Sequence, residues 1–240
     1  MTRELASIWV YLATSPLLWL TVTLLAYQAA LWLYRRARQS ALANPVAVAV
    51  ALIIALLLAT GTAYETYFAG AQFVHFLLGP ATVALAVPLY AQWPRLKRNA
   101  RAVLAALFCG SLTAIVSAVA IARLLGASEA TQWSLAPKSV TTPIAMGIAE
   151  KIGGLPSLTA VLVVTTGILG AMIAPALFRR IGVRSEAGRG LALGLAAHGI
   201  GTARAFQSSE TTGAFAALAM GLNGLLTALV LPLLAGRLPG

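Results

Sequence analysis

Apolar segments of about 20 residues dominate this chain, and they restrict its fold more than any other feature. A helix needs roughly 20 apolar residues to span the hydrocarbon of a bilayer. Only 10% of the 240 residues are charged, whereas soluble domains carry about 25%. The sequence therefore predicts an all-α polytopic membrane protein with one domain over 1–240. The predicted apolar spans are 15–34, 45–60, 71–90, 102–125, 156–178, 190–206 and 213–234.

The basic residues predict how these spans are oriented. The net charge of +11 would suggest nucleic-acid binding in a soluble protein. Here Lys and Arg gather in short loops, so the tendency of basic loops to stay in the cytoplasm explains them without a nucleic-acid partner. The predicted cytoplasmic clusters are 35–38, 95–101 and 179–189. The predicted outer turns, which contain Glu and no Lys or Arg, are 61–67, 126–133 and 207–212.

One polar, proline-containing stretch interrupts the apolar sequence at 137–150. Irregular polar backbone survives at membrane depth only where protein or water covers it. If the stretch crossed the membrane, Arg179 and Arg180 would lie outside. A stretch that enters and returns keeps them inside and also places the C-terminus in the cytoplasm. Charge parity thus predicts seven spans plus a re-entrant broken helix.

The layout also predicts an inverted repeat of two four-element halves, 15–126 and 131–237. In each half the middle span is interrupted, at Gly79-Pro80 and at 198–201. Inverted repeats with discontinuous helices are typical of secondary transporters, whose site lies near the bilayer midplane.

The first candidate site cluster consists of Lys138, Ser139, Thr141 and Thr142. A helix N-terminus favours an anion, and hydroxyls and a lysine add donors and charge. The alternative is that Lys138 reaches the membrane interface and the hydroxyls cap a helix. Pro143 directly after this cluster argues against an ordinary helix interior.

The second cluster is centred on His198 and Arg204, with Gly199, Gly201 and Thr202 between them. Glycines in a membrane helix permit local unwinding or close approach. Arg204 could bind a carboxylate bidentately, and His198 could carry a proton. The alternatives place Arg204 at the outer interface and make His198 a packing residue. Proton coupling through His198 is favoured over sodium coupling, because no carboxylate is placed to help bind sodium.

Gly79 and Thr82 form a third candidate cluster with His75, and Asn223 is an isolated amide in the last span. An interface role for His75 is as reasonable as a site role, and a membrane-embedded amide usually bonds a neighbouring helix. No enzyme is predicted, since Gly-x-Ser-x-Gly, His-Glu-x-x-His and phosphate-loop motifs do not occur. No cofactor or metal is expected, and Cys109 is interpreted as a small buried apolar residue.

Several of these motifs, in this order, resemble the LrgB/CidB family of bacterial membrane proteins. The resemblance covers nearly the whole chain from about residue 15. The chain departs from the family in two places. Ala197 stands before the histidine, where relatives often have Ser, and Gln207 stands soon after the arginine-alanine pair, where relatives often have Glu. The matching segments are 79–88, 137–145, 153–160, 198–205 and 213–234.

The resemblance implies two alternative functions. One is a holin/antiholin-like regulator of murein hydrolase export and lysis, and the other is a transporter of small carboxylates such as pyruvate, lactate or glycolate. The chain is similar to one part of a plastid glycolate/glycerate translocator, the other part resembling LrgA/CidA. A small LrgA/CidA-like subunit and a location in a bacterial inner membrane are therefore expected. A homo-oligomer is expected as well. Transport is favoured, because a holin-like lesion does not require interrupted polar segments.

Overall fold

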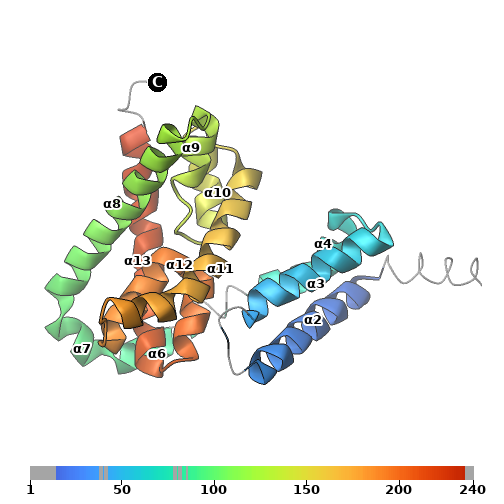
Figure 1. Ribbon diagram of the computed structural model, residues 1–240, viewed down its shortest axis with the longest axis horizontal. Coiled ribbons are helices and arrows are strands. Elements are labelled where there is room, and N and C mark those ends of the chain that lie inside the picture. Colours follow the sequence, from blue (N-terminus) through green and yellow to red (C-terminus); the bar gives the residue numbers. More distant parts are fainter. Residues whose placement is uncertain are drawn as a thin grey trace, which may run out of the picture. The chain divides into compact units, whose positions relative to one another are not determined.

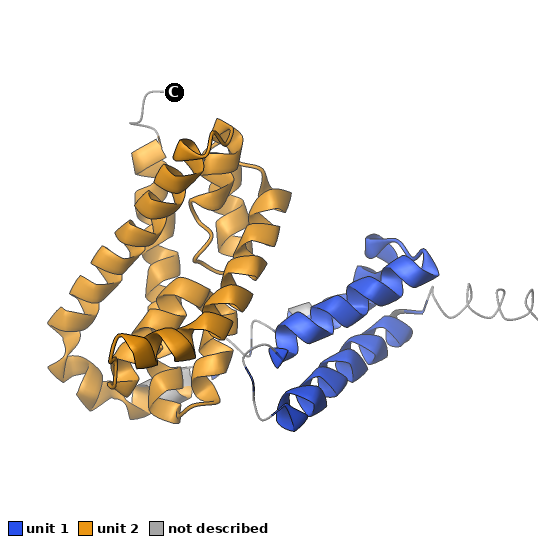
Figure 2. Ribbon diagram, viewed as in Figure 1, with its two compact units in different colours: residues 1–84 blue, residues 85–240 orange. Residues whose placement is uncertain are grey.

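The computed structural model describes residues 15–37, 40, 43–77, 80, 83–84 and 86–235. Every regular element in these residues is a helix, as predicted (Figure 1). Four of the described helices are long and apolar enough to cross a bilayer: Leu17–Arg36, Ala100–Leu124, Pro156–Arg180 and Glu210–Ala235. The chain divides into two compact units, Met1–Ala84 and Leu85–Gly240 (Figure 2). The predicted halves, 15–126 and 131–237, stay a prediction.

The first unit consists of α2 (Pro16–Arg36), α3 (Pro45–Thr60) and α4 (Tyr64–Phe76). Asn44 begins α3 by accepting hydrogen bonds from the backbone N–H groups of Val46 and Ala47, at 2.9 and 3.2 Å. Gly61, with φ of 63°, ends it. Helix α4 then begins inside the stretch predicted as a polar turn, because Tyr67 packs edge-on against Trp19 of α2 with ring centroids 5.8 Å apart.

The second unit contains three long helices and several shorter ones. The long helices are α8 (Ala100–Leu124), α11 (Pro156–Arg180) and α13 (Glu210–Ala235). The others are α6 (Ala86–Ala91), α7 (Trp93–Arg98), α9 (Glu129–Leu135), α10 (Thr142–Lys151) and α12 (Glu186–Phe206). Helix α9 occupies part of the predicted 126–133 turn, since the side chain of Ser128 accepts from the Thr131 N–H and starts it.

Helices α9 and α10 form a re-entrant hairpin, here called the first hairpin (residues 129–151). The last turn of α9 is joined to the start of α11, which follows the hairpin: Leu155 N–H donates to Ser134 Oγ at 2.7 Å, and Thr159 Oγ1 donates to the Ser134 carbonyl at 3.0 Å. The tip between the helices, residues 137–141, reaches Asn223 near the middle of α13. The predicted re-entrant segment is therefore present.

Helix α12 is also a hairpin, here called the second hairpin. The backbone leaves helical geometry at Ala197 and at His198, whose φ and ψ are 39° and −129°. Beyond this point the chain reverses, and a Cβ placed on Gly201 would overlap the Leu193 carbonyl. Eight residues of straight helix would separate these positions by about 12 Å. The predicted interruption at 198–201 is thus a reversal.

Contacts with α13 confirm the direction of both arms. Gly190 lies against Thr212 and Gly194 against Ala216, so the first arm runs parallel to α13. The second arm runs back along it, with Thr202 Oγ1 3.8 Å from Met220 Sδ and Phe206 against Gly213. Small residues permit this close helix packing. The second hairpin therefore begins and ends at one end of the unit.

This reversal corrects the predicted topology after residue 186. The span 190–206 does not cross, and the turn 207–212 lies at the same end as the basic α7, because Arg95 Nη1 donates to Thr211 Oγ1 at 3.1 Å. Helix α13 then leads away to the end occupied by α9 (Figure 1). The prediction that 207–212 lies opposite the basic clusters is therefore wrong within this unit, because it counted 190–206 as a crossing. The side of the membrane on which the C-terminus lies stays a prediction.

The second unit therefore contains the same arrangement twice, with opposite directions. A hairpin entering from one end is followed by α11, and a hairpin entering from the other end is followed by α13. Both following helices contain a proline near their C-terminal end, Pro175 and Pro232.

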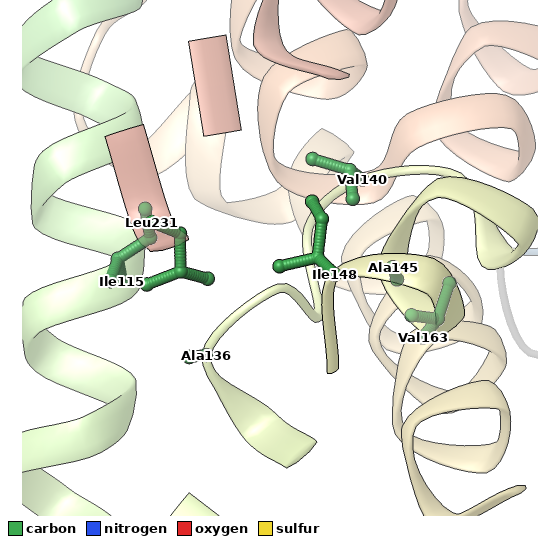
Figure 3. Packing of buried hydrophobic residues seen from close by; sticks show 7 residues of the cluster. All are labelled: Ile115, Ala136, Val140, Ala145, Ile148, Val163 and Leu231. Carbon is green, nitrogen blue, oxygen red and sulfur yellow. The ribbon is translucent and has the colours of Figure 1, made fainter. Parts of the chain in front are cut away.

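Apolar packing holds the first hairpin inside the unit. Figure 3 shows side chains from the tip, from α10 and from three long helices converging on one cluster. The cluster consists of Ile115, Ala136, Val140, Ala145, Ile148, Val163 and Leu231. The tip is thus packed into the core of the unit.

Candidate functional site

The tips of the two hairpins meet at Asn223, near the middle of α13. Its side-chain Nδ2 donates to the Ser139 carbonyl in the first tip and to the Leu195 carbonyl in the second, each at 3.2 Å. Asn223 is 1% exposed. Each tip leaves carbonyl groups without helical partners, and the amide satisfies one in each. The structure thus brings together Ser139 and Asn223, which the sequence placed in separate clusters.

The first tip presents Lys138 and a helix N-terminus. The Lys138 ammonium donates to Ser139 Oγ at 3.2 Å. Helix α10 begins beside it at Thr142, with Thr141 at the N-cap and without a side-chain bond to the first turn. The predicted capping alternative for Thr141 is therefore wrong. Pro143 in the first turn has no N–H to satisfy, which suits this position.

His198 is buried in the second tip and held by α11. Its Nε2 lies 2.9 Å from the Val163 carbonyl oxygen, and because a carbonyl only accepts, Nε2 is the protonated nitrogen. The positive φ of 39° is unfavourable for a residue with a side chain. Gly167 gives the ring room, since a Cβ there would lie 2.8 Å from two ring atoms.

Lys138 and His198 come from opposite hairpins, Lys138 from the first tip and His198 from the second. The second arm of α12 begins just after His198, at Gly199. Thr202 is buried in that arm, where its hydroxyl donates to the His198 carbonyl at 2.8 Å, and Gly201 is at the close contact with Leu193 described above.

Arg204 lies near the end of α12, away from the tip. Its Nη1 donates to Gln207 Oε1 at 3.0 Å, about two turns of helix beyond His198. This is the end of the unit that carries the basic α7. The predicted cluster members Gly79 and Thr82 lie outside the described residues. His75 is in α4.

The sequence reasoning did not single out several residues that build this site. Ser111 and Thr227 lie near the middle of α8 and α13, with their hydroxyl oxygens 3.4 Å apart. They line a small cavity next to the first tip that does not admit a water-sized sphere, together with Asn223 and Ser139. A hydroxyl in the middle of an apolar span was the available signal for both. Nothing in the sequence marked Gly167 or Val163.

The chemistry of this centre suits an anion. Two helices begin at the tips, α10 and the second arm of α12, so both direct free N–H groups and a positive dipole end toward mid-depth. Lys138 adds a positive charge. No group of three or more His, Cys, Asp or Glu that could hold a metal ion occurs in the described residues. The site therefore has the donors for a small carboxylate.

Comparison with known proteins gives a consistent family assignment. The LrgB-like family matches residues 23–236. Among curated proteins, the chain is 39% identical to the uncharacterized protein YwbG of Bacillus subtilis (strain 168), over 90% of this chain and 95% of YwbG. It is 32% identical to the antiholin-like protein LrgB of Bacillus mycoides (strain KBAB4), over 91% and 95%. No solved structure matches.

Proposed function

This chain belongs to the LrgB-like family of membrane proteins, and we propose that it is the core subunit of a secondary transporter for small monocarboxylates such as pyruvate, lactate or glycolate. The observation that carries the proposal is the meeting of two oppositely directed hairpins at Asn223. Discontinuous helices whose N-termini point at an anion near mid-depth are a recurring device of secondary transporters.

Each polar group at the tips has a role in the proposed site. The carboxylate accepts from backbone N–H groups at the start of α10 and of the second arm of α12. The Lys138 ammonium, held at Ser139 Oγ, neutralises its charge. Thr141 and Thr142 supply hydroxyl donors, and Gly199 lets substrate approach the backbone of the second tip. Arg204 acts at the entrance, since it lies about two helical turns from His198.

Alternating access follows from the arrangement of the hairpins. The first hairpin separates the site from one side of the membrane and the second from the other. Movement of one hairpin opens the site to its own side, while the other hairpin keeps it closed. The neighbouring long helices, or a small LrgA/CidA-like subunit, provide the fixed surface.

The orientation follows from the basic residues. Helix α7 and the last turn of α11 carry five Lys or Arg residues: Arg95, Lys97, Arg98, Arg179 and Arg180. We place this end in the cytoplasm of a bacterial inner membrane. The second hairpin then enters from the cytoplasm, the first enters from outside, and the C-terminus lies outside.

Labelled-substrate uptake into proteoliposomes tests the proposal, with and without the LrgA/CidA-like subunit. Lys138→Ala should lower pyruvate uptake roughly tenfold or more, because a charge-assisted hydrogen bond contributes about 1.5–3 kcal/mol. Arg204→Ala should raise KM more than it lowers kcat. Lys151→Ala is the matched control, since Lys151 is an exposed lysine at the C-terminal end of α10, the helix that follows the first tip.

The second candidate function is an antiholin-like regulator of lysis, which the names of relatives such as the Bacillus mycoides protein support. Dye release from the same vesicles separates the two. Non-selective leakage that neither Lys138→Ala nor Arg204→Ala changes would favour the lysis regulator and refute the transporter.

A further inference from the structure

We propose that the small cavity beside the first tip is a binding site for a small monovalent cation, Na⁺ or Li⁺, with Asn223 Oδ1, Ser111 Oγ and Thr227 Oγ1 as ligands. This inference rests on the proposed transport function for its purpose, although cation binding is tested without transport. In the sequence, sodium was the weaker alternative because no carboxylate was available. The neutral side-chain oxygens of these three residues provide ligands for sodium without a carboxylate.

The first observation is an acceptor that lacks a partner. The Nδ2 of Asn223 donates to the Ser139 and Leu195 carbonyls. A carbonyl oxygen can only accept, so the amide atom that faces both carbonyls is the nitrogen, and the other atom is the oxygen Oδ1. Among the described residues, Asn223 Oδ1 is the one buried side-chain polar atom without a hydrogen bond. An unsatisfied buried acceptor costs about 1–3 kcal/mol. Such a group in a midplane site indicates a ligand.

The second observation is the pair of hydroxyls that line the same cavity. Ser111 Oγ and Thr227 Oγ1 are 3.4 Å apart, well beyond the distance of about 2.7–2.8 Å preferred by O–H···O hydrogen bonds. Both residues are at most 3% exposed. The two hydroxyls are thus joined only by a long hydrogen bond, and together with Asn223 they line one cavity from two helices. Hard oxygen ligands suit hard cations.

Size and charge restrict the occupant. The cavity measures about 150 Å³ in total, but its free space does not admit a water-sized sphere. A bare Na⁺ or Li⁺ is smaller than a water molecule, whereas K⁺ is larger than Na⁺. No acidic side chain from the described ranges lines the cavity, so a divalent ion would leave two uncompensated charges at mid-depth, where such charge is costly. A small monovalent ion fits both limits.

Cation binding would act on both hairpins through one amide. A cation on Oδ1 polarises the amide and strengthens the two bonds that Nδ2 donates to the tips. Lys138 beside the tip opposes the cation until a carboxylate neutralises it. Cation and carboxylate should therefore bind cooperatively, which is the coupling that a symporter requires.

The test is the melting temperature of the purified protein in Na⁺, Li⁺, K⁺ or choline chloride at constant ionic strength, without substrate. We expect Na⁺ at about five times its dissociation constant to raise Tm by roughly 2–4 °C, with K⁺ and choline equal to each other. Thr227→Val and Ser111→Ala should each raise the half-saturating Na⁺ concentration roughly tenfold. Thr113→Ala is the control, because that exposed hydroxyl on the same helix as Ser111 bonds the Cys109 carbonyl instead.

A wild-type Tm that is the same in all four salts overturns the cation site, as does a Na⁺ shift that both ligand variants retain. Added pyruvate should lower the half-saturating Na⁺ concentration, and an unchanged value refutes the coupling. Uptake of pyruvate without any sodium dependence would refute the coupling of the cation to transport and leave the transporter intact.

Discussion

Replacing Gly167 with alanine tests whether the second hairpin is held by α11 as described. The added Cβ would lie 2.8 Å from Cε1 and from Nε2 of His198, a separation that real Cβ atoms do not tolerate. The ring cannot move freely, because its Nε2 is bonded to the Val163 carbonyl at 2.9 Å. The substitution must therefore displace α11 or the tip.

The expected cost follows from overpacking. An extra methyl group in a packed core costs about 1–3 kcal/mol, which lowers the Tm of a chain of this size by roughly 2–4 °C per kcal/mol. The intrinsic preference of a helix for alanine over glycine, about 0.8–1.0 kcal/mol, acts in the opposite direction. Gly221→Ala isolates that preference, since Gly221 lies in α13 and a Cβ added there would have no atom within 4 Å. This control should leave Tm unchanged or higher.

A double-mutant cycle identifies the ring as the cause. His198→Gly removes the imidazole and suits the positive φ at this position. In that background Gly167→Ala should lose most of its destabilising effect, giving a coupling free energy of at least about 1 kcal/mol; the remainder comes from Ile200 Cδ1, 2.9 Å from the added Cβ. The assay is thermal unfolding of detergent-purified protein. Additive effects of the two substitutions would refute the proposed contact between α11 and the second tip.

Two further predictions concern one helix connection in each unit. Ser134→Ala removes the bond from the Leu155 N–H and should destabilise the second unit by about 1 kcal/mol. The exposed Ser157→Ala is the control. Equal melting temperatures of the two variants would contradict the role of Ser134 in joining α9 to the start of α11. Asn44→Ala removes the N-cap of α3 and should lower the stability of that helix by about 1 kcal/mol. The measurement is amide hydrogen exchange, which should become faster in the first turn of α3 and stay unchanged in α8.

The sequence was sufficient to predict most helices, because the bilayer requires long apolar segments. The predicted span 102–125 became Ala100–Leu124, and 213–234 became Glu210–Ala235. The re-entrant first hairpin was also predicted, since charge parity and the prolines at 137 and 143 pointed to it. These are local or compositional signals, which do not depend on the partners of each residue.

The second hairpin could not be predicted in the same way. Residues 190–206 have nearly the length of a crossing, and their glycines permit a kink, a break or a reversal. The choice depends on tertiary packing: Gly194 and Phe206 both lie against α13, and this is possible only when the arms are antiparallel. The junction at Asn223 was missed for the same reason, because the bond between Asn223 and Ser139 joins residues far apart in the chain.

The central claim is that the hairpin tips form a carboxylate site that opens alternately to each side. A single cysteine at the first tip tests it most directly: Thr141→Cys in a background where Cys109, an exposed cysteine of α8, is replaced by alanine. Labelling with a membrane-impermeant thiol reagent in oriented vesicles should proceed from both sides, and pyruvate should protect the cysteine. Labelling from one side alone, at a rate that pyruvate, lactate and glycolate leave unchanged, would contradict the account.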